Sequence, residues 1–374
     1  MSQKKIVISG INVVDSGILS IMTDCLNQLE KYSTNKNIKI IALVNSQKLF
    51  STPNIEYIEF PKSKKNWLFR LYYEYFHFKK LSKEFKADVW FSMHDLSPNV
   101  VSKNKYVYYH NPSPFYKLSN REWFFGFKIG LFSKFYKYLT QINIHSNDAV
   151  FVQQHWIKNQ FEQWFSIKNC KVAYPETQVN IDKSKVELNP KKVHFFYPSF
   201  PRMFKNFECI CDAILKLPIE TQNKIEVHFT ISGNENKYAK SIYKTYSKYE
   251  CFKFVGKLNR NEVAGYYEAM NALLFPSKLE TWGLPLTETK EFNKPIFVSD
   301  LPYAKETVGN YNKVSFFNPS NSDELAEKLK LFITNKLEFD ETKNSKKPDF
   351  VGWNSIFDYI FEEDKSFQHI IHDS

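Results

Sequence analysis

The chain alternates short apolar runs with longer segments of mixed polarity. In its first half, such runs predict strands at 6–9, 38–44, 89–92, 106–109 and 149–152, and helical periodicity appears at 19–29 and 67–86. Short continuous apolar runs are typical of strands buried on both faces, as in a parallel sheet covered by helices. The pattern therefore predicts an α/β domain with a parallel sheet.

A second alternation begins after a polar, charge-rich interval at 176–192. It predicts strands at 193–197, 225–231, 252–255, 272–275 and 295–298, and helices at 206–217 and 261–270. Another polar break, 342–348, precedes a tail with helical periodicity at 353–361. We expect two Rossmann-like domains, residues 1–185 and 186–348, followed by a terminal helix within 349–374.

The most specific pattern is Phe-Pro-Ser-Lys-Leu-Glu-Thr-Trp-Gly-Leu-Pro-Leu-Thr-Glu at 275–288. It predicts the end of a strand, then a loop, then a helix beginning near Leu286. Such a unit presents the free N–H groups of the helix N-terminus to an anionic ligand. Glu280 and Glu288 stand eight positions apart around the loop. A sugar and a ribose joined by a pyrophosphate would suit this site, with one carboxylate for each ring.

This segment resembles the Glu-x7-Glu motif of retaining GT-B glycosyltransferases, specifically glycosyltransferase family 4. The matching positions are Pro276, Ser277, Glu280, Gly283, Leu284, Pro285 and Glu288. The resemblance implies two Rossmann-like domains that face each other across a cleft, with the last helix crossing back onto the first domain. It also implies that Glu288 holds the ribose hydroxyls, and that Glu280 contacts the donor sugar and supports the oxocarbenium charge.

Two cations, Arg202 and Lys205, stand between a predicted strand and a predicted helix. They would direct positive charge at one volume, which a departing pyrophosphate needs as its glycosidic bond breaks. The segment resembles the basic element with which the family holds the nucleotide diphosphate. The spacing between the two cations is shorter here than in many members.

Glycines and a histidine at predicted strand ends extend the candidate site. No Gly-x-Gly-x-x-Gly follows the first strand, which argues against a dinucleotide oxidoreductase. By the resemblance, a loop with Gly17 lies near the donor phosphate, although many members have paired glycines where Ser16 stands here. The resemblance also implies that the loop with Gly256 and Leu258 lines the nucleobase pocket, and that His110 meets the donor sugar.

Metal and redox chemistry are not indicated. The chain has no Asp-x-Asp, the motif with which metal-dependent GT-A enzymes hold their cation, so we expect a reaction without metal or other cofactor. The five cysteines, Cys25, Cys170, Cys209, Cys211 and Cys251, show no metal-ligand spacing and suit a reduced, cytosolic protein. The N-terminus lacks the apolar region of a signal peptide, and no apolar stretch reaches the length of a membrane span.

Positive charge is concentrated in the first half. Residues 1–185 hold 26 Lys and Arg against 14 Asp and Glu, whereas the whole chain has a net charge of +11. Segments 62–80 and 121–137 interleave cations with aromatic residues, which favours the headgroup region of an anionic membrane. The alternative is core helices with snorkelling lysines. For 62–80 the membrane-surface and core-helix interpretations are equally open, and for 121–137 the core-helix interpretation is favoured. No nucleic-acid-binding pattern is present, so no nucleic-acid partner is expected.

These features predict a retaining transferase that moves a hexose-type sugar from a nucleotide-diphosphate sugar to a glycan acceptor. The basic, aromatic first half suggests a polyprenyl-diphosphate-linked acceptor at the inner face of a bacterial membrane, as in O-antigen or capsule assembly. Two alternatives stay open: a nucleotide-sugar 2-epimerase of GT-B fold, which would need further acid/base groups, and a catalytically silent glycan-binding protein.

Overall fold

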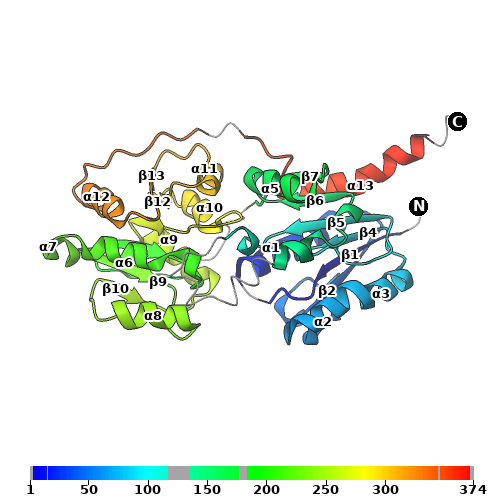
Figure 1. The fold of residues 1–374 in the computed structure, drawn as a ribbon, viewed down its shortest axis with the longest axis horizontal. Helices are drawn as coiled ribbons and strands as arrows, with labels where there is room; N and C mark the ends of the chain where they lie inside the picture. Colours follow the sequence, from blue (N-terminus) through cyan, green and yellow to red (C-terminus); the bar gives the residue numbers. More distant parts are fainter. Residues whose placement is uncertain (1–2, 15, 117–134, 177–182, 344–345, 371–374) are drawn as a thin grey trace. The chain divides into compact units, whose positions relative to one another are not determined.

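The computed structural model describes residues 3–14, 16–116, 135–176, 183–343 and 346–370. These residues form two compact units (Figure 1). Unit 1 contains most of the chain up to Glu176 and the C-terminal segment from Lys347 onward. Unit 2 consists of Phe115–Leu131 and Thr177–Lys346. The last helix therefore belongs to the same unit as the first part of the chain.

Unit 1 is built on an eight-stranded parallel sheet in the order β14-β7-β6-β5-β4-β1-β2-β3. Its strands are β1 Lys4–Gly10, β2 Ile38–Val44, β3 Glu56–Glu59, β4 Val89–Ser92, β5 Asn104–Tyr109, β6 Ala149–Val152, β7 Cys170–Tyr174 and β14 Phe350–Val351. The central strands are fully buried, as the apolar runs predict.

The helices of unit 1 include α1 Ser16–Ser33, α2 Trp67–Tyr72, α3 Phe78–Phe85, α5 His155–Phe165 and α13 Gly352–Ile370. A π-helical turn, Tyr73–His77, joins α2 to α3, so residues 67–85 form one helical segment with a local irregularity. The returning helix α13 packs on α1. The Tyr32 hydroxyl donates to Asp358 Oδ1 at 2.9 Å, and the ring of Tyr32 lies 5.4 Å from that of Phe357.

Unit 2 is built on a six-stranded parallel sheet in the order β10-β9-β8-β11-β12-β13. Its strands are β8 Val193–Tyr197, β9 Ile225–Phe229, β10 Phe252–Phe254, β11 Ala272–Phe275, β12 Ile296–Ser299 and β13 Val314–Phe317. Its helices are α6 Phe207–Leu215, α7 Ile219–Gln222, α8 Lys237–Tyr246, α9 Arg260–Ala269, α10 Leu284–Glu291, α11 Pro302–Val308 and α12 Ser322–Ile333.

The predicted fold is confirmed: both units are Rossmann-like parallel α/β structures, and the last helix belongs to the first unit. The sequence pattern missed β3, β7, β13 and the two-residue strand β14. The sequence of β3 is Glu-Tyr-Ile-Glu at the sheet edge, and a lysine interrupts β7, so neither has a continuous apolar run. The five cysteines are buried and free, as expected for a reduced chain.

Of the two basic-aromatic segments, only 62–80 lies wholly within the described residues. Residues 62–80 are described, and they are helical from Trp67 onward. Most of 121–137 lies outside the described residues. Within the part of the chain that the structure describes, no helix is both long and apolar enough to cross a bilayer.

Candidate active site

Two loops of unit 2 meet at the carboxyl ends of neighbouring strands. One follows β8 and contains a short 3-10 turn, Met203–Lys205, and the other follows β11 at Pro276. The N–H of Lys278 donates to the carbonyl of Phe204 at 2.7 Å, and the Asn206 side chain donates to the carbonyls of Pro276 and Pro319. In open α/β sheets this edge is the usual ligand-binding edge.

Lys205 and Glu280, 75 residues apart, are brought together by these loops. The ammonium of Lys205 lies 2.5 Å from Glu280 Oε1, and both side chains are largely buried. The Tyr197 hydroxyl donates to the backbone carbonyl of Lys205 at 2.7 Å and fixes the turn. A cation and a carboxylate in contact at a strand end can serve a diphosphate and a sugar hydroxyl, respectively.

Glu288 lies on α10, whose first turn has the predicted loop-to-helix geometry. Gly283 precedes the helix with a φ of 89°, a left-handed conformation that favours glycine, and Pro285 occupies the first turn. The Tyr267 hydroxyl donates to Glu288 Oε2 at 2.7 Å. Burial and the neighbouring carboxylate raise the pKa of Tyr267, so this hydroxyl stays protonated and remains a donor. Nothing in the sequence marked Tyr267 as the residue that orients Glu288.

Arg202 is exposed at the start of the same turn as Lys205. Its guanidinium carbon lies 6.0 Å from the centre of the Phe204 ring, and the ammonium of Lys205 lies 5.8 Å from it. The two predicted cations thus flank one aromatic ring. Arg202 is on the solvent side, while Lys205 is the buried member that contacts Glu280.

The remaining glycine candidates lie at strand or helix ends. Gly256 follows β10 with a φ of 75° and donates its N–H to the carbonyl of Ile231, and Leu258 stands two residues later, partly buried. Gly17 is the second residue of α1 in unit 1 and is exposed. The positions agree with the expected loops, while their roles in ligand binding stay predictions.

His110 follows β5 in unit 1, at the carboxyl edge of that sheet, and is almost fully buried. Its ring stacks on Tyr108 with centroids 4.5 Å apart. Burial lowers the pKa of His110 to about 3, so the imidazole is neutral at physiological pH. It is therefore suited to hydrogen bonding with a sugar rather than to donating a proton as an imidazolium.

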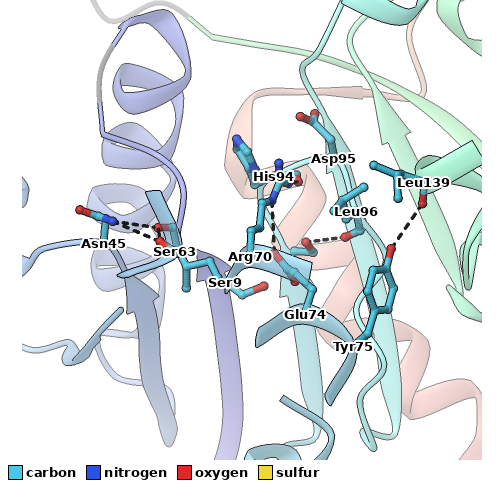
Figure 2. Close-up of polar contacts among 12 residues, drawn as sticks. Ser9, Asn45, Ser63, Arg70, Glu74, Tyr75, His94, Asp95, Leu96 and Leu139 are labelled. Atoms are coloured by element: carbon cyan, nitrogen blue, oxygen red, sulfur yellow. Dashed lines mark hydrogen bonds and ion pairs between the residues drawn. The ribbon is translucent and has the colours of Figure 1, made fainter. Parts of the chain in front are cut away.

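A buried polar network lies next to this edge of the sheet (Figure 2). Its members are Arg70 and Glu74 from the helical segment, His94 and Asp95 after β4, and Tyr136. Arg70 donates from its terminal nitrogen to the carbonyl of His94 at 2.7 Å. Nothing in the sequence pattern marked Arg70 or Glu74 as members of such a network.

One cluster among the described residues has metal-ligand chemistry: His194, Glu226 and His228, on β8 and β9. His194 and Glu226 are the second residues of β8 and β9, and His228 is the fourth residue of β9. Two ammonium groups, from Lys192 and Lys253, lie 3.0 and 3.6 Å from Glu226 Oε1. They already balance the carboxylate and would repel a divalent cation, so we interpret the cluster as a structural polar group.

Two Rossmann-like units, with a lysine–glutamate pair and a second glutamate beside a helix start, define the GT-B class of architecture. Residues 178–347 match the model of a protein family described as "Glycosyl transferases group 1". The matched residues make up most of unit 2. No curated protein matches the sequence at a significant level.

Solved structures with a similar fold include several glycosyltransferases. The lipopolysaccharide outer core galactosyltransferase WaaB is 14% identical with a TM-score of 0.60, over 90% of this chain and 92% of WaaB. HepE from Anabaena, solved with UDP-glucose, is 14% identical with a TM-score of 0.63, over 89% and 91%. WaaG, a glycosyltransferase of lipopolysaccharide biosynthesis, is 10% identical with a TM-score of 0.65, over 88% and 92%. At these identities the likeness establishes the GT-B fold.

Proposed function

We propose that the protein is a retaining glycosyltransferase that moves a hexose-type sugar from a nucleotide-diphosphate sugar to a glycan acceptor. The observation that carries the proposal is the contact between Lys205 and Glu280 at the carboxyl edge of the unit 2 sheet. It lies within the segment that matches group 1 glycosyltransferases. HepE, which has the same fold, was solved with UDP-glucose, which supports a nucleotide sugar as donor.

The contacts suggest a division of roles. Lys205, on a turn fixed by Tyr197 and Asn206, supplies positive charge to the diphosphate as the glycosidic bond breaks. Glu280 contacts the donor sugar and stabilises the positive charge that develops on its ring. Glu288, oriented by Tyr267, accepts hydrogen bonds from the ribose. Charge neutralisation by Lys205, Arg202 and the start of α10 makes a metal ion unnecessary for this chemistry.

Retention requires that the acceptor hydroxyl attacks from the face that the diphosphate leaves. In this proposal the departing phosphate takes the acceptor proton, so that no protein base is needed on that face. His110, neutral at the edge of the unit 1 sheet, contributes a hydrogen bond to the donor sugar.

We further propose that the acceptor is linked to a polyprenyl diphosphate and that unit 1 binds an anionic membrane surface. The support comes from the helical segment 67–78, in which apolar residues are exposed and charged residues are buried. Leu68, Tyr72 and Phe76 recur every four residues on its exposed side and are 77%, 53% and 70% accessible. Arg70 and Glu74, on the opposite side, are only 2% accessible. The interpretation of 67–80 as a buried core helix is wrong for these three apolar residues.

Neighbouring groups extend this exposed face. Lys62, Lys64 and Lys65 precede the helix and are all exposed. Phe135 and Tyr138, in a later helical segment, are also exposed. A ring contact between Trp67 and Tyr136 joins this segment to the helical segment 67–78. Aromatic and aliphatic side chains flanked by lysines suit the boundary between lipid headgroups and acyl chains.

A transfer assay tests the proposed activity. Purified protein would be incubated with UDP-, GDP-, CDP- and ADP-sugars and a lipid-linked glycan acceptor, and the product analysed by NMR. We expect one donor class to react and the product to keep the anomeric configuration of the donor. An inverted product contradicts the retaining mechanism, and an epimerised free nucleotide sugar without transfer would support the epimerase alternative.

A further inference from the structure

Asp95 is a buried carboxylate that joins the ends of two strands in unit 1. It follows β4 and is 3% accessible. Its Oδ1 accepts the backbone N–H groups of His110 at 2.6 Å and of Asn111 at 3.1 Å, just beyond β5. Its Oδ2 accepts the Tyr136 hydroxyl at 3.2 Å. One side chain therefore fixes the backbone at the end of β5, at His110 and Asn111.

The backbone of Asp95 is itself held in an unusual conformation. Its φ is 65°, in the left-handed region that residues other than glycine adopt uncommonly. Such conformations persist where the surroundings over-determine them, and they gather at functional sites. Here the three hydrogen bonds accepted by the carboxylate maintain the conformation.

Arg70 stabilises the backbone next to Asp95. Its terminal nitrogen donates to the carbonyl of His94, the residue before Asp95. Its Nε lies 4.0 Å from Glu74 Oε1. Figure 2 shows Arg70 and Glu74 lying close to the strand end that carries His94 and Asp95. The Asp95 carboxylate bonds the backbone of His110 and Asn111, and the Arg70 guanidinium bonds the backbone of His94, so we assign each a role through the residues that it fixes.

We infer that Asp95, supported by Arg70, is a positioning residue for His110: it fixes the backbone at the end of β5 and so holds the imidazole in place for sugar transfer. This inference rests on the proposed function of His110. A residue that only stabilised the fold would lower the melting temperature without a selective effect on turnover. A positioning residue lowers kcat in protein that is fully folded, because small displacements of a reacting group have large effects on rate.

The experiment compares three carboxylate variants. Asp95→Ala removes all three hydrogen bonds, and we expect kcat to fall about 10- to 100-fold. Affinity for the nucleoside diphosphate should change less than about threefold, because the nucleotide-binding groups belong to unit 2. Asp95→Asn keeps an oxygen for both N–H groups and should recover kcat to within about threefold of wild type. All rates are measured well below the melting temperature of each variant.

Asp88→Ala is the matched control. Asp88 precedes the same strand, β4, at its other end, and its carboxylate accepts the N–H of Lys5 at 2.9 Å. It should lose stability but not kcat. If Asp88→Ala lowers kcat as much as Asp95→Ala, or if Asp95→Asn fails to recover activity, the inference is overturned. Should Asp95→Ala not fold, Arg70→Lys replaces it: losing the guanidinium bond to His94 should lower kcat several-fold, and an unchanged kcat overturns the inference.

A second readout separates this inference from the proposed function. With 15N-labelled histidine, the His110 ring signals can be assigned by their loss in His110→Gln. We expect them to move in Asp95→Ala but not in Asp95→Asn or Asp88→Ala. If wild type transfers no sugar, the proposed function fails, and the ring signals still decide whether Asp95 positions His110. Unmoved His110 signals in Asp95→Ala would refute the positioning role.

Discussion

Glu74 offers a stability prediction whose size follows from its surroundings. The carboxyl is buried beside Arg70, and one of its oxygens, Oε2, has no hydrogen-bond partner among the described residues. Burial raises the pKa of Glu74 from 4.5 to about 7, the Arg70 charge offsets part of that rise, and Asp95 adds to it. The folded protein therefore binds this proton more tightly than the unfolded chain does.

The sign of the pH dependence follows from this raised pKa. Between about pH 4.5 and 7 the unfolded chain loses the proton first, so this group makes the folded state less stable as pH rises. The rise of the Glu74 pKa from 4.5 to about 7 corresponds to a penalty of about 3 kcal/mol above pH 7. Below pH 4.5 both states are protonated and the penalty disappears.

Glu74→Gln removes the charge and nearly keeps the shape. We expect its free energy of unfolding to exceed that of wild type by about 3 kcal/mol at pH 8 and by less than about 1 kcal/mol at pH 5. Urea denaturation across this pH range, with wild type and variant in the same buffers, gives the difference curve. Other titrating groups are common to both proteins and cancel to first order.

Glu84→Gln is the matched control, since Glu84 is exposed on α3 of the same helical segment. Its difference curve should remain flat. A flat curve for Glu74→Gln as well, or a variant that loses stability at pH 8 relative to pH 5, would refute the reasoning. Either result would mean that Arg70 compensates the buried carboxylate fully.

Three further predictions concern the proposed activity. Lys205→Ala and Glu288→Ala should each weaken nucleoside-diphosphate binding by about 1–3 kcal/mol without unfolding the protein; unchanged calorimetric affinity in both would contradict the assigned roles. Transfer should survive excess EDTA, and loss of turnover that Mg²⁺ or Mn²⁺ restores would disprove a metal-free mechanism. Replacing Lys62, Lys64 and Lys65 with Glu should weaken binding to anionic vesicles by about 3 kcal/mol at low salt. The same variant should transfer sugar to a lipid-linked acceptor more slowly, while its rate of donor hydrolysis should stay unchanged. The charge-matched control replaces three exposed lysines of unit 2: Lys248, Lys330 and Lys336. Equal flotation of wild type and the first triple variant would refute membrane binding by this face.

The sequence by itself determined the class of fold and the centre of the candidate site. Strands buried on both faces have continuous apolar runs, so most of their positions follow from local pattern alone. The loop before α10 is also local: its left-handed glycine and first-turn proline have direct conformational preferences. Edge or interrupted strands, such as β3 and β7, were missed because pairing with neighbours, rather than local apolarity, stabilises them.

The tertiary structure decided which distant side chains meet. Sheet order brings Lys205 to Glu280, and Asp95 to the N–H of His110, and no local pattern contains those pairings. It also decided the orientation of the helix at 67–78. Periodicity shows that Leu68 and Tyr72 share one face, but the usual rule would bury that face. Here the buried face instead carries Arg70, because its guanidinium bonds the carbonyl of His94, a partner that only the folded sheet provides.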